Sequence, residues 1–134
     1  MRHFTRARPR RSDRSSAPAV ALAIMFAVTG AIHFVRPSVF DPIVPRALPG
    51  PSRFWTVASG VAEWALALLA WNRPTRNLAG LLSAAFLVAV FPANVRTVGI
   101  LRRKPWPARL IALARLPLQL PLVALALRVG RGDR

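Results

Sequence analysis

Two ionisable side chains lie inside long apolar stretches, and they are the residues best placed to do chemistry: Glu63 and Arg115. Glu63 is eight residues from both Trp55 and Trp71, so it falls near the middle of its stretch. A charged side chain at the centre of a bilayer costs roughly 2.5–3.5 kcal/mol on insertion scales, and such residues usually face a partner inside the protein. Gln119 follows Arg115 by one helical turn and shares its face.

The depths of these residues predict that they meet. If the apolar stretches are membrane-spanning helices, the second and the fourth run in the same direction. Glu63 lies nine residues from the start of its stretch, whereas Arg115 and Gln119 lie five and nine residues from the start of theirs. At a rise of about 1.5 Å per residue, Glu63 is level with Gln119 and about 6 Å from the level of Arg115. A long Arg side chain covers that gap, so we predict a Glu63–Arg115 ion pair supported by Gln119.

Two further polar residues fall at the same depth. His33 and Asn94 lie near the far ends of the first and third stretches, on the side where the second and fourth begin. The sequence therefore predicts one ligand-binding group in a single leaflet, made of His33, Glu63, Asn94, Arg115 and Gln119. A purely structural ion pair that holds the bundle together is an alternative, because such pairs are common. A contact to a partner subunit is a third interpretation.

The elements that must position these residues are four nearly uncharged stretches, at residues 15–35, 54–72, 77–95 and 110–127. Each runs 18 to 21 residues, and about 20 are needed to cross a bilayer as a helix. Only helices or closed barrels satisfy the backbone in lipid, and no strand-like alternation is present. We predict an all-α fold, an integral membrane four-helix bundle in contact with the lipid bilayer. Small residues such as Gly30 and Gly60 favour close packing of its helices.

The first loop, residues 36–53, is unusual. It contains five prolines, too many for a helix, at positions 37, 42, 45, 49 and 51. Its apolar residues predict that this Pro-rich first loop lies on the membrane surface or caps the bundle, and a plain linker is the alternative. Pro92, Pro117 and Pro121 fall inside the third and fourth stretches and predict kinks there.

Composition limits the function. A net charge of +16 combined with 54% hydrophobic residues does not suit a soluble domain of 134 residues. The basic residues sit between apolar runs and not on one helical face, which disfavours a nucleic-acid partner. There is no Cys, and only two His and four acidic residues are present, so a protein-built metal site is not expected. No catalytic residues are evident, and we do not expect an enzyme in its own right.

The predicted organisation has three parts. Residues 1–17 are a basic, disordered arm, residues 18–128 the four-helix domain and residues 129–134 a polar tail. A cleaved signal peptide has the same pattern of a charged arm and an apolar stretch, but the first stretch is long enough to span. Eleven basic residues fall on the side of the termini and eight on the other. The positive-inside rule then favours an inner (plasma) membrane protein with cytoplasmic termini.

Five blocks of the sequence together resemble the DoxX-like family of small bacterial membrane proteins: residues 30–37, 40–49, 59–63, 90–95 and 115–119. Their order and spacing match over about residues 27–125. The resemblance implies a four-helix membrane bundle. It also implies a link to quinone-coupled oxidation of sulfur compounds, since named members of that family take part in it. With no Cys and no haem ligand pair, a redox role would need a bound quinone or a membrane redox partner subunit.

Three functions remain open. The first is a redox-associated subunit that binds a quinone or a similar lipid-soluble ligand, with Glu63, Arg115 and His33 near its polar head. The second is a small proton-linked transporter, which Arg115 disfavours because it would hold Glu63 ionised and repel a cationic substrate. The third is a structural or assembly protein with no ligand. A homodimer is compatible with each of them.

Overall fold

The protein is a bundle of four apolar helical segments. The computed structural model describes residues 16–132, and this part of the chain is helical with no strand. The segments comprise α1 (Ser16–Val35), α3 (Ser52–Trp71), the pair α4 (Arg76–Ala89) and α5 (Phe91–Leu101), and α6 (Trp106–Arg131). Each is long and apolar enough to cross a membrane. The chain is therefore an all-α, multi-pass integral membrane protein.

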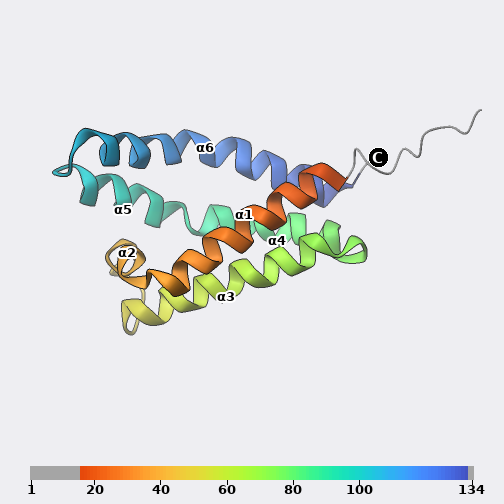
Figure 1. The fold of residues 1–134 in the computed structure, drawn as a ribbon, viewed down its shortest axis with the longest axis horizontal. Helices are drawn as coiled ribbons and strands as arrows, with labels where there is room; N and C mark the ends of the chain where they lie inside the picture. Colours follow the sequence, from red (N-terminus) through yellow and green to blue (C-terminus); the bar gives the residue numbers. More distant parts are fainter. Residues whose placement is uncertain (1–15, 133–134) are drawn as a thin grey trace, which may run out of the picture.

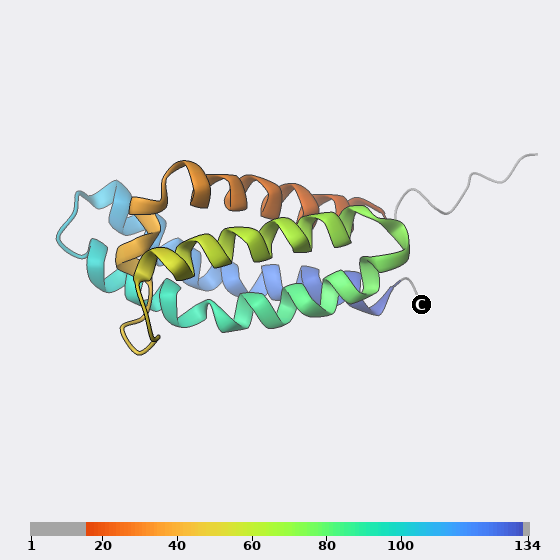
Figure 2. The ribbon, with the colours of Figure 1, turned by 90° about the horizontal axis from the view of Figure 1, so that it is seen from below.

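The helices run along the long axis of the molecule and turn at its two ends (Figure 1, Figure 2). One end carries the first loop, with the short helix α2 (Pro37–Phe40) and the 3-10 turn η1 (Asp41–Ile43), and also the turn between α5 and α6. The opposite end carries the start of α1, the 3-10 turn η2 (Arg73–Thr75) and the end of α6. We call these the loop end and the terminal end.

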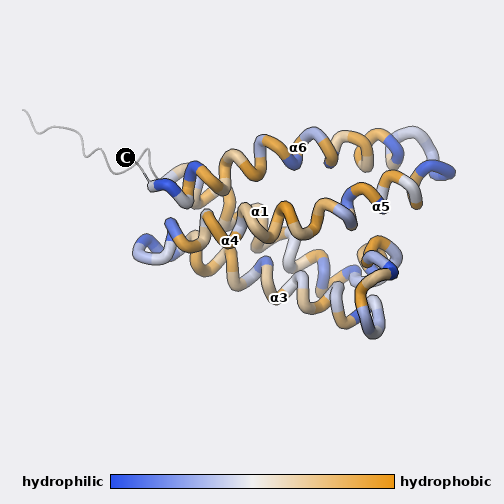
Figure 3. Tube along the Cα trace, turned by 180° about the vertical axis from the view of Figure 1, so that it is seen from behind, coloured by the Kyte–Doolittle hydropathy of each residue, from blue (hydrophilic) through white to orange (hydrophobic). Residues whose placement is uncertain are grey.

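The outer surface is suited to lipid. Apolar residues follow one another along the helices, and hydrophilic residues gather toward the two ends (Figure 3). Trp71 closes α3 and Trp106 opens α6, with 62% and 72% of their surface exposed, as aromatic residues at a membrane interface would be. The predicted four spans are confirmed. The last helix runs to Arg131, into the expected polar tail, whereas the basic arm lies outside the described residues except for Ser16 and Ala17, which begin α1.

Glycines set the spacing of two helix pairs. A Cβ at Gly60 would lie 2.9 Å from the Cβ of His33, and one at Gly30 would lie 3.1 Å from the Gly60 carbonyl oxygen. These two glycines therefore bring α1 and α3 close together, as their small size predicts. The indole of Trp64 donates a hydrogen bond to the Ala27 carbonyl at 3.1 Å across the same contact. Gly80 brings α4 and α6 close together in the same way, because a Cβ at this position would collide with the Gly130 backbone.

The third span is broken at Val90, between α4 and α5. Pro92 has no backbone N–H, and the helical ladder is interrupted just before it. The Leu87 carbonyl, which would accept from residue 91 in a continuous helix, instead accepts a hydrogen bond from the Gln119 side chain. A neighbouring helix thus satisfies a backbone group that the break exposes, as membrane proteins require. In contrast, α6 stays one helix through Pro117 and Pro121.

The apolar core occupies the terminal half of the bundle. It is built by the first part of α1, the last part of α3, α4 and the last part of α6, through residues that include Leu22, Phe26, Leu66, Leu87 and Val129. Phe26 meets Phe86 edge to face, with ring centroids 5.9 Å apart. Phe86 packs against this core next to the break in the third span, and none of the core residues lies in α5.

Close packing at Gly80 gives a direct test of the fold. We expect Gly80→Ala to lower the free energy of unfolding by about 2 kcal/mol or more, because the new methyl group meets backbone that cannot move aside. Gly99→Ala is the matched control: a Cβ there meets no atom within 4 Å. That control should be neutral or stabilising by up to about 1 kcal/mol, as for Gly→Ala in an exposed helix. Unfolding in mixed detergent micelles measures both, and equal effects would contradict the packing of α4 on α6.

Candidate functional site

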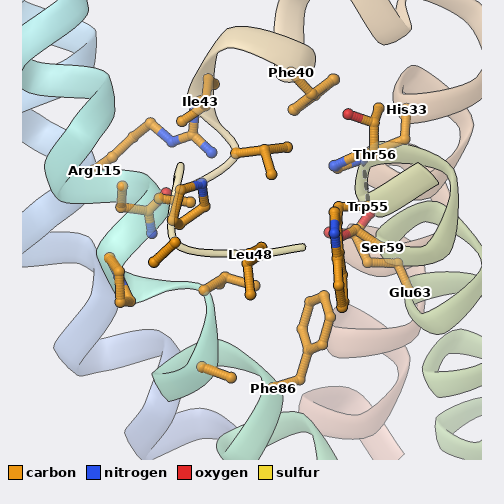
Figure 4. Close-up of a pocket in the computed structure, with 18 residues that line it drawn as sticks. His33, Phe40, Ile43, Leu48, Trp55, Thr56, Ser59, Glu63, Phe86 and Arg115 are labelled. Atoms are coloured by element: carbon orange, nitrogen blue, oxygen red, sulfur yellow. Dashed lines mark ion pairs between the residues drawn. The ribbon is translucent and has the colours of Figure 1, made fainter. Parts of the chain in front are cut away.

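A cavity of about 400 Å³ occupies the loop end of the bundle. This size lies within the range of small-molecule sites in proteins. Its walls come from all four spans, and most of its lining is apolar (Figure 4). The polar or ionisable side chains among its lining residues are His33, Trp55, Thr56, Ser59, Glu63, Asn94 and Arg115.

The first loop lines one side of this cavity. Six apolar residues between the end of α2 and the start of α3 line it: Phe40, Ile43, Val44, Pro45, Ala47 and Leu48. In Figure 4 the loop passes across the space between Arg115 on one side and His33 with Glu63 on the other. The loop therefore caps the bundle, which is one of the two arrangements predicted from its apolar residues, and it is not a plain linker.

Four polar contacts fasten the loop. The Asp41 carboxylate accepts hydrogen bonds from the Thr56 hydroxyl at 2.7 Å and from the Arg53 guanidinium at 2.9 Å. Trp55 Nε1 donates to the Pro49 carbonyl at 2.7 Å, and Arg96 Nε donates to the Pro42 carbonyl at 2.9 Å. The hydrogen bonds from Arg53, and then from Thr56, hold the pKa of Asp41 below its ordinary value of 3.8.

Glu63 pairs with His33. The Oε2 atom of Glu63 lies 3.1 Å from Nδ1 of His33, and each side chain is about nine-tenths buried. Nδ1 also lies 2.8 Å from the Thr29 carbonyl. Because a carbonyl oxygen only accepts, Nδ1 carries the hydrogen and directs it at Thr29. Glu63 Oε2 is thus buried beside a nitrogen but receives no aligned hydrogen bond from residues 16–132. The residue as a whole lines the cavity.

The predicted Glu63–Arg115 ion pair is wrong. Within the described part of the chain Arg115 makes no ion pair, and it lies across the cavity from Glu63 (Figure 4). The depths of the two residues do bring them to one cavity. However, α3 packs mainly against α1, so the neighbour of Glu63 is a residue of α1, His33. The prediction failed because depth along a helix does not specify which helices are adjacent.

Gln119 has a different role from the one predicted. It is 6% exposed and does not line the cavity. Its Oε1 accepts a hydrogen bond from Asn94 Nδ2 at 2.9 Å, and its Nε2 donates to the Leu87 carbonyl. Gln119 therefore joins α6 to both sides of the break in the third span and does not support Arg115. Through this bond it holds Asn94, which does line the cavity.

The structure brings four of the five predicted site residues to one cavity, and it places the fifth directly behind Asn94. Thr56 and Trp55 also line the cavity, although neither was predicted as a site residue from the sequence. A signal was present, because Thr56, Ser59 and Glu63 are spaced three and four residues apart and so share a helical face. Between Ser16 and Gly132 no group of three or more His, Asp or Glu side chains is placed to hold a metal ion.

A family model described as Domain of unknown function (DUF8561) matches residues 22–130 of this chain. The match begins within α1, ends one residue before the end of α6, and includes the first loop and the whole of the second and third spans. No curated protein and no solved structure matches the chain.

The identity of the partner of Glu63 can be tested by stability. His33→Leu removes the nitrogen that lies 3.1 Å from the buried Glu63 carboxyl, and we expect a loss of about 3 kcal/mol of unfolding free energy. Glu63→Gln should cost less, about 1 kcal/mol, because His33 keeps its bond to the Thr29 carbonyl. Arg115→Gln serves as the control and should have little effect. A loss for Arg115→Gln as large as for His33→Leu would instead support the ion pair that the sequence predicted.

We expect the stability that the Asp41 contacts give to the first loop to depend on pH. The folded-state pKa of Asp41 lies below 3.8, so the stability it contributes is complete well above that pH and is lost as pH falls through the folded-state value. We expect Asp41→Asn to lower the thermal unfolding temperature equally at about pH 7 and pH 5.5. The difference from wild type should shrink once pH drops below 3.8. If the difference in unfolding temperature between wild type and Asp41→Asn stays constant in acid, the contacts of the Asp41 carboxylate do not stabilise the loop.

Proposed function

We propose that this chain, which belongs to the family described as Domain of unknown function (DUF8561), binds a quinone or a similar lipid-soluble molecule in its cavity. The observation that carries the proposal is the Glu63 carboxyl, a buried ionisable group that lines a mostly apolar cavity together with Arg115. A buried carboxyl requires polar partners. A ligand with a polar head would add one from the side of the cavity.

The chemistry of the lining supports a ring that carries carbonyl groups. Arg115 offers only donors and can bond one carbonyl oxygen, and the Thr56 and Ser59 hydroxyls line the other side. His33 and Glu63 together can hold or release a proton at a second oxygen. The apolar side chains of the loop and Phe86 would contact the ring itself. A quinone combines these features in one molecule that partitions into lipid.

The redox setting is part of the same proposal. Neither the cavity nor the rest of residues 16–132 offers a Cys or a metal-binding cluster, so an electron would pass between the bound quinone and a partner subunit. The resemblance to the DoxX-like family supports this reading. The excess of basic residues on the side of the termini supports a plasma membrane protein with its termini in the cytoplasm.

Proton-linked transport is the second candidate, and one observation bears on it. Glu63 pairs with His33 and not with Arg115, and a carboxyl within a span is the kind of group that proton-linked transporters use. Arg115 nevertheless lines the same cavity and would oppose a cationic substrate. We therefore rank ligand binding first.

The proposal predicts that the purified protein carries quinone. The protein would be expressed in a quinone-containing bacterial host, purified in mild detergent and extracted with organic solvent, and the quinone measured by chromatography. We expect close to one quinone per chain in wild type and about a tenfold loss in Glu63→Gln and in Arg115→Gln, the effect of removing a charge-assisted hydrogen bond. Arg102→Gln, a change outside the cavity, should retain the quinone.

An unrelated four-helix membrane protein, purified in the same way, gives the background of lipid carried by the micelle. Quinone at this background in wild type would overturn the proposal. The His33–Glu63 pair would then be a structural element of the α1–α3 contact, and the search would move to partner proteins.

A further inference from the structure

The first loop covers the cavity on one side. Residues 36–51 lie at the loop end of the bundle, and six of their apolar side chains line the cavity. A ligand that enters on this side, from the level of the lipid headgroups, passes this segment.

Few backbone hydrogen bonds hold the second half of the loop. Residues 44–51 contain no helical ladder, and within them the Leu48 N–H to the Pro45 carbonyl is the one backbone hydrogen bond that the structure shows. Gly50 has a positive φ of 82°, and no atom lies within 4 Å of where its Cβ would be. This is a conformation that glycine adopts without strain. The segment thus joins α3 through a glycine with open space around it.

The contacts that hold the loop are made by side chains that also form the cavity. Thr56, whose hydroxyl bonds to Asp41 at 2.7 Å, is itself a lining residue. Trp55, whose indole bonds to the Pro49 carbonyl, is another. The ion pair of Asp41 with Arg53, at 2.8 Å, lies further out and is more than half exposed on the Arg53 side. Exposed ion pairs of this kind are weak, so the polar hold on the loop rests mainly on the bonds of Thr56, Trp55 and Arg96.

We propose that the first loop, residues 36–51, is a lid over the cavity, latched by Asp41 to Thr56 and Arg53, and that release of this latch admits the ligand from the membrane surface. The proposal rests on the cavity being a ligand site, as inferred above. A ligand head that bonds to Thr56 competes directly with Asp41 for its hydroxyl. Occupation of the cavity and opening of the lid are then coupled through one side chain.

Because the chain has no Cys, a single introduced thiol reports access to the cavity. Ser59→Cys places a thiol among the lining residues beneath the lid. Its rate of reaction with a water-soluble methanethiosulfonate reagent would be measured in mild detergent, with and without Asp41→Asn. We expect Asp41→Asn to raise the rate about tenfold, the factor expected for loss of a charge-assisted hydrogen bond and an exposed ion pair. Gly99→Cys is the control, since that position faces open space, and its rate should not change.

The outcomes separate the lid from other effects. Equal rates for Ser59→Cys with and without Asp41→Asn would overturn the proposal, and so would a rise of the same size in the Gly99→Cys control. If Asp41→Asn loses helical content by circular dichroism, Arg53→Gln replaces it. This variant keeps the bond between Asp41 and Thr56, so a smaller rise, about threefold, is expected, and no rise would overturn the lid.

The labelling experiment needs no ligand, so it fails independently of the proposed function. Faster labelling in Asp41→Asn with no bound quinone in wild type would leave the lid in place and refute the quinone. Bound quinone with unchanged labelling would refute the lid alone and indicate entry between the helices from the bilayer.

Discussion

The contact between Gly30 and Gly60 is the constraint on which the site depends. These residues let the backbones of α1 and α3 approach until a Cβ on Gly60 would lie 2.9 Å from the Cβ of His33. At this spacing the imidazole of His33 reaches the carboxyl of Glu63, three residues further along α3. With larger residues at the contact, Glu63 would stand in the apolar interior without a neighbouring nitrogen, which membrane proteins rarely tolerate. The close packing of Gly30 and Gly60 therefore provides the buried carboxyl of Glu63 with a neighbouring nitrogen.

The two halves of the bundle differ in how their centre is filled. At the terminal end the apolar core fills the space between the helices, and Gly80 holds α4 against the Gly130 backbone of α6. At the loop end the third span is broken at Val90, and the cavity lies where the core ends, beside Phe86. Gln119 stabilises this break by bonding to the Leu87 carbonyl and to Asn94. The irregular backbone that creates the cavity is therefore buried in protein and satisfied, which is the condition for its presence at membrane depth.

The fold and the depth of the site could be predicted from the sequence because both follow from one-dimensional quantities. Stretches of apolar residues give the spans, and counting residues from their ends brings His33, Glu63, Asn94 and Arg115 to one level. The pairing of Glu63 could not be predicted in this way, because it depends on helix rotation and on which helices are neighbours. The rotation of each helix and the identity of its neighbours are decided by side-chain packing, which for α1 and α3 depends on Gly30 and Gly60. Asp41 was missed for a similar reason: its partner Thr56 is distant in sequence, and only the path of the Pro-rich loop brings them together.

Because Glu63 pairs with His33 and not with Arg115, the cavity has a different charge distribution from the one predicted. Had Arg115 paired with Glu63, the two charges would have cancelled and the cavity would have been almost apolar. Instead, Glu63 is matched by a group that can itself gain or lose a proton, and Arg115 makes no ion pair within residues 16–132. A guanidinium that lines an apolar cavity interacts strongly with any electron-rich oxygen placed near it, since the local dielectric is low. The cavity therefore favours a carbonyl or an anionic head beside Arg115 and a proton-accepting or proton-donating oxygen beside Glu63, and it disfavours a cation.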